Sequence, residues 1–289
     1  MSGTGGSARP EQVDARRSRP TARRFGAAPS RSAAVVVLVV VGVVFAVPLL
    51  ALVQFTFRQG TTGALTGAHY AAIVDPVNQA TYQPVFDGLG ASLVIALITV
   101  AIVLLVLLPA QVVTALRYPR LRRVLEFVCI VPITVPAVVL VVGFVPVYQV
   151  VSQVLGSGAW TLSFAIGIVA LPFAFRPIAA AITATDMTTL SEAARSLGAS
   201  WWTVTRRVLL PNLRRGILAA CFLAITVVLG EYTLASFLSR TTFQTALVLV
   251  QQTDPYVSAI FSLGALVFGF VLLVAIGRIG SRRPTKESA

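Results

Sequence analysis

The sequence has few of the side chains from which catalytic and metal sites are built. It contains two cysteines, Cys129 and Cys221, a single histidine, His69, and a single lysine, Lys286. Both cysteines lie within apolar runs, without a CxxC spacing or companion histidines, so neither a zinc site nor a disulfide framework is expected. No hydrolytic triad can be drawn around His69. We therefore expect no catalytic residue, no metal and no cofactor bound by this chain.

Charged side chains are also scarce. They make up 11% of the 289 residues, whereas hydrophobic side chains make up 56%. Soluble domains carry about 25% charged residues, and a water-soluble fold could not hide this much apolar surface, so the composition indicates a membrane protein. The net charge is +13, but the basic residues lie in short segments between apolar runs. This pattern is typical of a topology signal and argues against a nucleic-acid partner.

Six apolar runs are long enough to cross a bilayer as helices. They cover residues 33–53, 89–108, 124–148, 160–181, 216–238 and 257–279. The sequence thus predicts an all-α, polytopic membrane protein with one membrane domain, residues 33–280. Residues 1–32, rich in Gly, Ser, Pro and Arg, are expected to form a disordered basic tail, and residues 281–289 a second tail. Residues 54–88 are expected to form an extramembrane loop with a short helix at 70–74.

Lysine and arginine counts indicate the orientation of the spans. With the N-terminus inside, the inner side holds seven arginines in the tail, four between spans two and three, five between spans four and five, and four Lys or Arg from Arg278 onward. The outer side holds only Arg58 and Arg240, and Arg176 lies near the inner end of span four. We therefore expect six spans with both termini in the cytoplasm.

The loop between spans four and five, residues 184–215, is the most informative segment. Thr189 and Glu192 fit a capping box, with Thr189 as the N-cap, which predicts a short helix that runs to about Leu197. Gly198 interrupts this helix, as a residue that terminates a helix at low cost. The small face of the helix lacks a bulky apolar stripe, which favours docking against another protein over burial in lipid.

A second, amphipathic segment follows in the same loop. Between residues 200 and 210, Trp, Val and Leu are interleaved with Thr and Arg, and Pro211 is expected to end the segment. One interpretation is an interfacial connector that tryptophan and arginine anchor in the headgroup region. This interpretation fits the first helix of the loop less well, because its small Glu192-Ala193-Ala194 face favours close docking against another protein.

The spacing in this loop resembles a family signature. Glu192-Ala193-Ala194 is followed by three residues and Gly198, then by nine residues, Val208, one residue and Leu210-Pro211. This spacing matches the EAA motif of binding-protein-dependent ABC importer permeases. Val208, where isoleucine is usual, is the one departure.

Other parts of the chain are similar to the same family. They are the six spans, the arginine-rich segment 116–123 and the proline-rich segment 131–136. The resemblance covers about residues 35–280 and implies the fold of a type I ABC importer permease. Within the family, residues 229–238 look most like the branch that transports spermidine and putrescine. Permeases for iron(III), thiamine, phosphonate, sulfate and molybdate are close relatives and remain alternatives.

The resemblance also implies a mechanism and a set of partners. In such importers the EAA loop is a coupling helix that docks on one of two cytoplasmic ATP-binding subunits, whose closure drives two permease subunits from inward-facing to outward-facing. A solute-binding protein delivers the solute to the outer face. The expected coupling residues are Glu192, Ala193, Ala194, Gly198, Val208, Leu210 and Pro211.

The ATP chemistry is expected to belong to a partner. No G-x-x-x-x-G-K-[ST] motif occurs in the sequence, so ATP and Mg²⁺ are expected on the ATP-binding subunits and the chain is not expected to be an enzyme. The resemblance places it in a bacterial cytoplasmic membrane, beside a second permease subunit that is a different chain.

Two carboxylates lie at or within the predicted spans. Glu126, at the start of span three, is expected to pair with Arg122 or Arg123. Glu231 lies about two thirds along span five, far from the basic clusters. A carboxylate there is costly, so Glu231 and the adjacent Tyr232 are candidates for the translocation pathway, favouring a cationic or hydroxyl-rich solute. The alternative is that Glu231 is neutral or is capped by a neighbour.

Two other classes of protein compete with the importer permease. A secondary transporter usually has inverted repeats around a midplane site, and no repeat is visible here. It would also leave the EAA spacing unexplained. A structural membrane subunit is the other alternative, because a fold alone does not fix a function.

Overall fold

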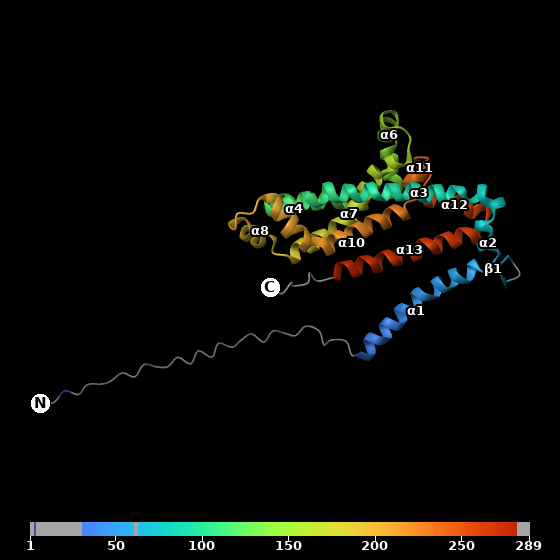
Figure 1. The fold of residues 1–289 in the computed structure, drawn as a ribbon, viewed down its shortest axis with the longest axis horizontal. Helices are drawn as coiled ribbons and strands as arrows, with labels where there is room; N and C mark the ends of the chain where they lie inside the picture. Colours follow the sequence, from blue (N-terminus) through green and yellow to red (C-terminus); the bar gives the residue numbers. More distant parts are fainter. Residues whose placement is uncertain (1–2, 4–30, 61–62, 282–289) are drawn as a thin grey trace. The chain divides into compact units, whose positions relative to one another are not determined.

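The computed structural model describes residues 3, 31–60 and 63–281. The predicted tails, residues 1–32 and 281–289, therefore lie almost entirely outside the described residues. The chain divides into two compact units, with the boundary between Leu50 and Ala51. Most of the first helix, α1 (Arg31–Thr56), belongs to the first unit, and the elements that follow form the second. Figure 1 labels these elements along the chain.

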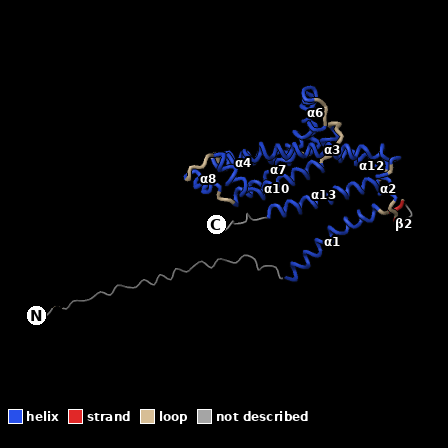
Figure 2. Tube along the Cα trace, in the orientation of Figure 1, coloured by secondary structure: helices blue, strands red, loops and turns tan. Residues whose placement is uncertain are grey.

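The second unit begins with the end of α1 and a short hairpin. Strands β1 (Arg58–Gln59) and β2 (Ala64–Leu65) pair antiparallel. The helix α2 (Ala68–Val74) confirms the predicted short helix, and the 3-10 turn η1 (Pro76–Asn78) follows it. As Figure 2 shows, the other described elements are all helical.

The second apolar run lies within a helical segment much longer than predicted. Helix α3 (Gln79–Ile102), the π-helical turn η2 (Val103–Leu107) and helix α4 (Leu108–Leu116) continue one another. The prediction placed residues 79–88 in a loop and was wrong. Although this stretch is polar, it is helical because Tyr82 and Val85 are buried in a cluster with side chains of α12 and α13. The burial of these two side chains stabilises the helix.

The third predicted span is broken into two helices. Helix α5 (Pro119–Thr134) and helix α6 (Ala137–Leu155) are separated by Val135 and Pro136. Val135 is extended, with φ −95° and ψ 127°, because a proline ring disfavours helical backbone at the preceding residue. The predicted single helix over 124–148 was therefore wrong. Figure 1 shows α6 turned away from the direction of α3 and α7.

The fourth predicted span matches α7 (Leu162–Ala184), which the 3-10 turn η3 (Ala159–Thr161) precedes. The remaining elements are α8 (Met187–Ser196), α9 (Trp201–Thr203), the π-helical turn η4 (Val204–Leu209), α10 (Leu210–Gly230), α11 (Thr233–Phe237), α12 (Phe243–Thr253) and α13 (Pro255–Ser281). The fifth predicted span, 216–238, is thus interrupted after Gly230. Helix α12 falls in a segment that was predicted to be a loop.

Six helical segments of the described chain are long and apolar enough to cross a membrane. They are 31–56, 76–116, 137–155, 159–184, 201–230 and 255–280. The prediction of an all-α protein with six spans is confirmed. The side of the membrane on which the termini lie stays a prediction.

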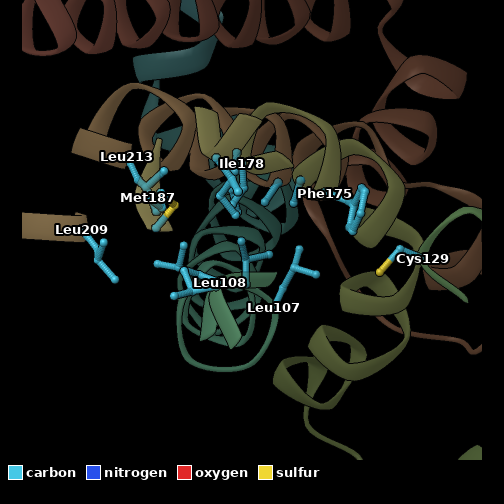
Figure 3. Close-up of a cluster of buried hydrophobic side chains, with 14 of the residues drawn as sticks. Leu107, Leu108, Cys129, Phe175, Ile178, Met187, Leu209 and Leu213 are labelled. Atoms are coloured by element: carbon cyan, nitrogen blue, oxygen red, sulfur yellow. The ribbon is translucent and has the colours of Figure 1, made fainter. Parts of the chain in front are cut away.

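A buried apolar cluster joins the loop between α7 and α10 to the helices around it. Met187 of α8 and Leu209 of η4 lie in this cluster with Leu108 of α4, Ile178 of α7 and Leu213 of α10. Figure 3 shows these side chains together with Leu107, Cys129 and Phe175. A second cluster joins α3, α6, α7, α10 and α11, and a third joins α3, α12 and α13.

Candidate functional site

Helix α8, which carries the EAA residues, begins one turn earlier than predicted. Asp186 is its N-cap: Thr189 donates to the Asp186 carboxylate from its backbone N–H (3.2 Å) and from its hydroxyl (2.7 Å). These hydrogen bonds from the Thr189 side chain and backbone hold the pKa of Asp186 below its usual value. The predicted capping box of Thr189 and Glu192 was wrong, because the aspartate three residues before Thr189 takes the capping position.

The end of α8 has a regular stop signal. The Gly198 N–H donates to the Arg195 carbonyl (2.9 Å), and the Ala199 N–H donates to the Ala194 carbonyl (3.1 Å). This pair of bonds is the Schellman motif, in which the residue after the C-cap adopts a left-handed backbone. Gly198 occupies that position with φ +83°. The expected interruption of the helix at Gly198 is confirmed.

The two faces of α8 differ in burial. Met187 and Ser191 are buried, and Ala194 packs against the same apolar cluster. On the other side, Glu192 and Ala193 are exposed. Leu197, at the end of the helix, is 88% exposed. The helix therefore has one face held by the membrane domain and one exposed face without a partner in the described chain.

The second segment of the loop does not end at Pro211. Ser200 is the N-cap, accepting from the Thr203 N–H (3.3 Å), and the helical path from Trp201 continues to Gly230. Trp201 lies under the Arg117 guanidinium, with 5.4 Å from Cζ to the ring centroid. The expected end at Pro211 was wrong, because this residue lies in the first turn of α10.

Each π-helical turn directly precedes a Leu-Pro pair. Turn η2 ends before Leu108-Pro109, and turn η4 ends before Leu210-Pro211. Inside an α-helix, a proline lacks the N–H for the bond to the carbonyl four residues earlier, and its ring clashes with that carbonyl. A π-helical turn widens the backbone there. The helix accommodates the proline in this way and does not stop.

The structure separates the expected coupling residues into two groups. Glu192, Ala193, Gly198 and Pro211 are exposed, whereas Ala194, Val208 and Leu210 pack against the cluster that contains Leu209. The second group therefore seats the loop on the membrane domain and does not form an outer surface.

Glu231 lies at a break between helices. Helix α10 ends at Gly230, the backbone of Glu231 is extended, and α11 begins at Thr233. A Glu231 carboxylate oxygen accepts from the Leu234 N–H (2.7 Å), so the side chain caps the start of α11. Glu231 is half-buried and Tyr232 is 41% exposed. This capping contact corresponds to the structural alternative considered for Glu231.

A polar pocket of about 390 Å³ lies beside Tyr232, between α11 and α12. Its polar lining was not predicted and comprises Tyr232, Ser236, Ser239, Arg240, Thr241, Thr245 and Gln252. The Arg240 guanidinium donates to the Ser157 carbonyl and to the Ser152 hydroxyl (2.7 Å), while its Nε is buried without a partner. The one sequence feature that could have indicated this pocket is Arg240, because it is one of only two basic residues that the sequence assigns to the outer side.

The expected ion pair of Glu126 does not form. Arg122 donates to the Thr183 hydroxyl of α7 (2.9 Å). Within the described residues, no ion pair links Glu126 to Arg122 or Arg123. The fold therefore uses Arg122 to join α5 to the C-terminal end of α7.

Comparison with known proteins places this arrangement in a family. The sequence model of the family described as "Binding-protein-dependent transport system inner membrane component" matches residues 108–283, which is more than half of the chain. The chain belongs to this family. The matched part of this permease component runs from α4 to the end of α13 and contains α8 and Glu231.

The permease component is also similar to a curated protein of Sinorhizobium fredii (strain NBRC 101917 / NGR234), described as "Probable ABC transporter permease protein y4fN". The two are 26% identical over 207 residues, which cover 68% of this chain and 35% of that protein. The chain thus spans about a third of the length of this curated relative.

Proposed function

We propose that this chain is a transmembrane permease subunit of an ATP-driven solute importer, and that α8 with its glycine stop is the element that couples it to an ATPase. The observation that carries the proposal is the two-faced burial of α8. Met187 is buried in the membrane domain, while Glu192, Ala193 and Leu197 are exposed. A short, capped helix with one face exposed, and with Leu197 at its end among the exposed side chains, suits docking into a cleft of a protein partner.

The side chains packed behind α8 connect this helix to α7 and α10, so a displacement of α8 is transmitted to both. Met187 of α8 lies in one close-packed cluster with Ile178 of α7 and Leu213 of α10 (Figure 3). Close-packed side chains transmit displacement instead of absorbing it. A pull on α8 by a closing ATPase dimer therefore moves the inner ends of two spans together, which is the step that alternating access requires.

The proposal includes the partners of the subunit. Two cytoplasmic ATP-binding subunits bind ATP and Mg²⁺, so this chain contributes neither a cofactor nor a catalytic residue. A second permease subunit, a different chain, completes the pathway, and an extracytoplasmic solute-binding protein supplies the solute. The arginine distribution supports an orientation with both termini inside a bacterial cytoplasmic membrane.

Two observations bear on the solute. The resemblance of residues 229–238 to the spermidine and putrescine branch, together with the Glu231 carboxylate, supports a polyamine, and iron(III) or thiamine fit the same carboxylate. The pocket beside Tyr232 supports a second candidate class, because Arg240 supplies a cation that has no acidic partner among the described residues. Phosphonate, sulfate and molybdate are anions, so their charge is complementary to that of Arg240.

Co-purification with the ATP-binding subunits tests the coupling role. Because Glu192 is exposed, Glu192→Lys is expected to leave the fold intact but to weaken co-purification and to uncouple ATP hydrolysis from uptake. Asp87→Lys, the same charge change at an exposed site of α3, is the matched control and is expected to change neither. Normal assembly and uptake in Glu192→Lys would show that α8 is not the coupling element.

Uptake assays and ligand screening test the solute class. Thermal-shift screening of the solute-binding protein against polyamines, metal ions, thiamine and oxyanions identifies the solute. Glu231→Gln retains an oxygen that accepts from the Leu234 N–H and removes only the charge. A loss of polyamine uptake in this variant supports the carboxylate, whereas oxyanion uptake that falls only in Arg240→Gln supports the pocket.

A further inference from the structure

A long groove runs between α10 and α13 at their basic ends. It has a volume of about 680 Å³, and side chains of both helices line it. Leu218 and Phe222 contribute the α10 side, and Leu273 and Ile276 contribute the α13 side. The lining is apolar except at one end, where Arg215 stands. The groove is thus lined by apolar side chains along its length and by one cationic side chain at its end.

The Arg215 guanidinium is available for a ligand. Its Nε donates to the Gly280 carbonyl (2.9 Å), which holds the side chain across the end of α13. The residue is exposed, and its terminal nitrogens have no further acceptor within residues 31–60 and 63–281. A phosphate group at this end of the groove meets one oriented donor, the Arg215 guanidinium.

The length of the groove matches one leaflet of a bilayer. From Arg215 to Leu223, both of which line the groove, α10 rises about 12 Å at 1.5 Å per residue. The hydrocarbon core of a bilayer is about 30 Å thick, so one leaflet is about 15 Å. With Arg215 at the headgroup level, an acyl chain in the groove therefore runs through most of a single leaflet.

We propose that this groove binds an anionic phospholipid, with the phosphate on Arg215 and an acyl chain between α10 and α13. Charge complementarity decides the occupant: basic pockets between membrane helices are suited to anionic headgroups, whereas a protein helix filling the groove would leave the Arg215 terminal nitrogens without an anion. The bound lipid bridges the second turn of α10, near the loop that carries α8, and the end of α13.

Bromolipid quenching tests the proposal on the full chain purified with its associated subunits. Phe222→Trp places a reporter in the groove, and its signal is taken relative to the unaltered chain. Two types of vesicle are compared, each with equal parts of phosphatidylcholine and phosphatidylglycerol. In one type the acyl chains of phosphatidylcholine carry bromine, and in the other type those of phosphatidylglycerol do. We expect brominated phosphatidylglycerol to quench more, with a preference of up to about fivefold for one basic side chain. High salt is expected to reduce this ratio.

Matched variants separate charge from general lipid contact. Leu105→Trp, at a position of η2 that is 75% exposed, is expected to show equal quenching by the two lipids. In the Phe222→Trp background, Arg215→Gln should remove the preference and Arg215→Lys should keep it, although both variants lose the bond to the Gly280 carbonyl. Gly277→Leu, where an added Cβ meets open space, should fill the groove and reduce quenching by both lipids.

Three results would overturn the proposal. Equal quenching by the two brominated lipids in Phe222→Trp means that the groove has no headgroup preference. A preference that survives both Arg215→Gln and high salt means that Arg215 does not hold the phosphate. Absence of quenching by either lipid means that protein, either α1 or the second permease subunit, covers the groove.

Discussion

Gly198 is the position at which a single methyl group tests the coupling element most directly. Its φ is +83°, and an added Cβ would meet no atom within 4 Å. A substitution there introduces no clash, so its effect comes from the backbone alone. Gly198→Ala is therefore expected to destabilise the end of α8 without disturbing the packing of the membrane domain.

The magnitude follows from the backbone conformation. A left-handed residue other than glycine costs about 1–2 kcal/mol, which raises the opening equilibrium of the Schellman motif about 5–30-fold. Asparagine tolerates this conformation better than alanine, so Gly198→Asn is expected to have a smaller effect. Gly143→Ala is the control, because Gly143 is a helical residue of α6 with equally open surroundings, and alanine is favoured over glycine there.

Hydrogen exchange followed by mass spectrometry measures the effect on the reconstituted chain. The amides of Gly198 and Ala199, which donate to the carbonyls of Arg195 and Ala194, should lose protection in Gly198→Ala and keep most of it in Gly198→Asn. Solute transported per ATP hydrolysed should fall in the same order. Unchanged protection in Gly198→Ala, or equal effects of alanine and asparagine, would refute the reasoning.

Three further predictions concern the frame around α8. Its hydrogen bonds keep the pKa of Asp186 below the unfolded value of about 3.9, so the cap stabilises α8 fully above that pH. The protection of α8 amides from hydrogen exchange should therefore fall as the pH drops through the lower folded pKa. Asp186→Asn should remove this pH dependence. Gly216→Ala places a Cβ 2.6 Å from a backbone carbonyl of α7 and should destabilise the domain by about 1–3 kcal/mol in thermal unfolding, while Gly90→Ala, in open space, should not. Ser92→Ala leaves the buried Phe243 N–H, now 2.9 Å from the serine hydroxyl, without an acceptor and should cost about 1–3 kcal/mol.

The sequence predicted the number of spans well and their ends poorly. Hydrophobic length counts apolar residues, so it detects the membrane-crossing part of α3 but not residues 79–88. That stretch is polar and becomes helical through tertiary contacts, such as Gly88 against the Thr242 carbonyl. The break at Pro136 follows a local rule for the residue before proline and was predictable, whereas Pro211 needed knowledge of the π-helical turn.

The site shows the same division between local and tertiary information. The glycine stop at Gly198 was recognised because its cause is local. The capping residue Asp186 was missed in favour of a motif that also fitted the sequence. Arg240 could not be placed beside Tyr232 from the sequence, because that proximity depends on how α11 and α12 fold back after Glu231.

The wide turn η4 lets this loop hold one residue more than a regular α-helix would. Val204 and Leu209 are 0% and 1% exposed although they are five positions apart, a step that sets two side chains about 140° apart on a regular α-helix. From Leu209 the next buried position, Leu213, returns to a step of four. The interval between Gly198 and Val208 thus includes one residue that only the wide turn accommodates. Deleting one residue within η4 would leave Val204 and Leu209 four positions apart, a step that a regular α-helix places on one face. Such a deletion is therefore expected to keep the rotation of α8 about the helix axis but to remove the wide turn that accommodates Pro211.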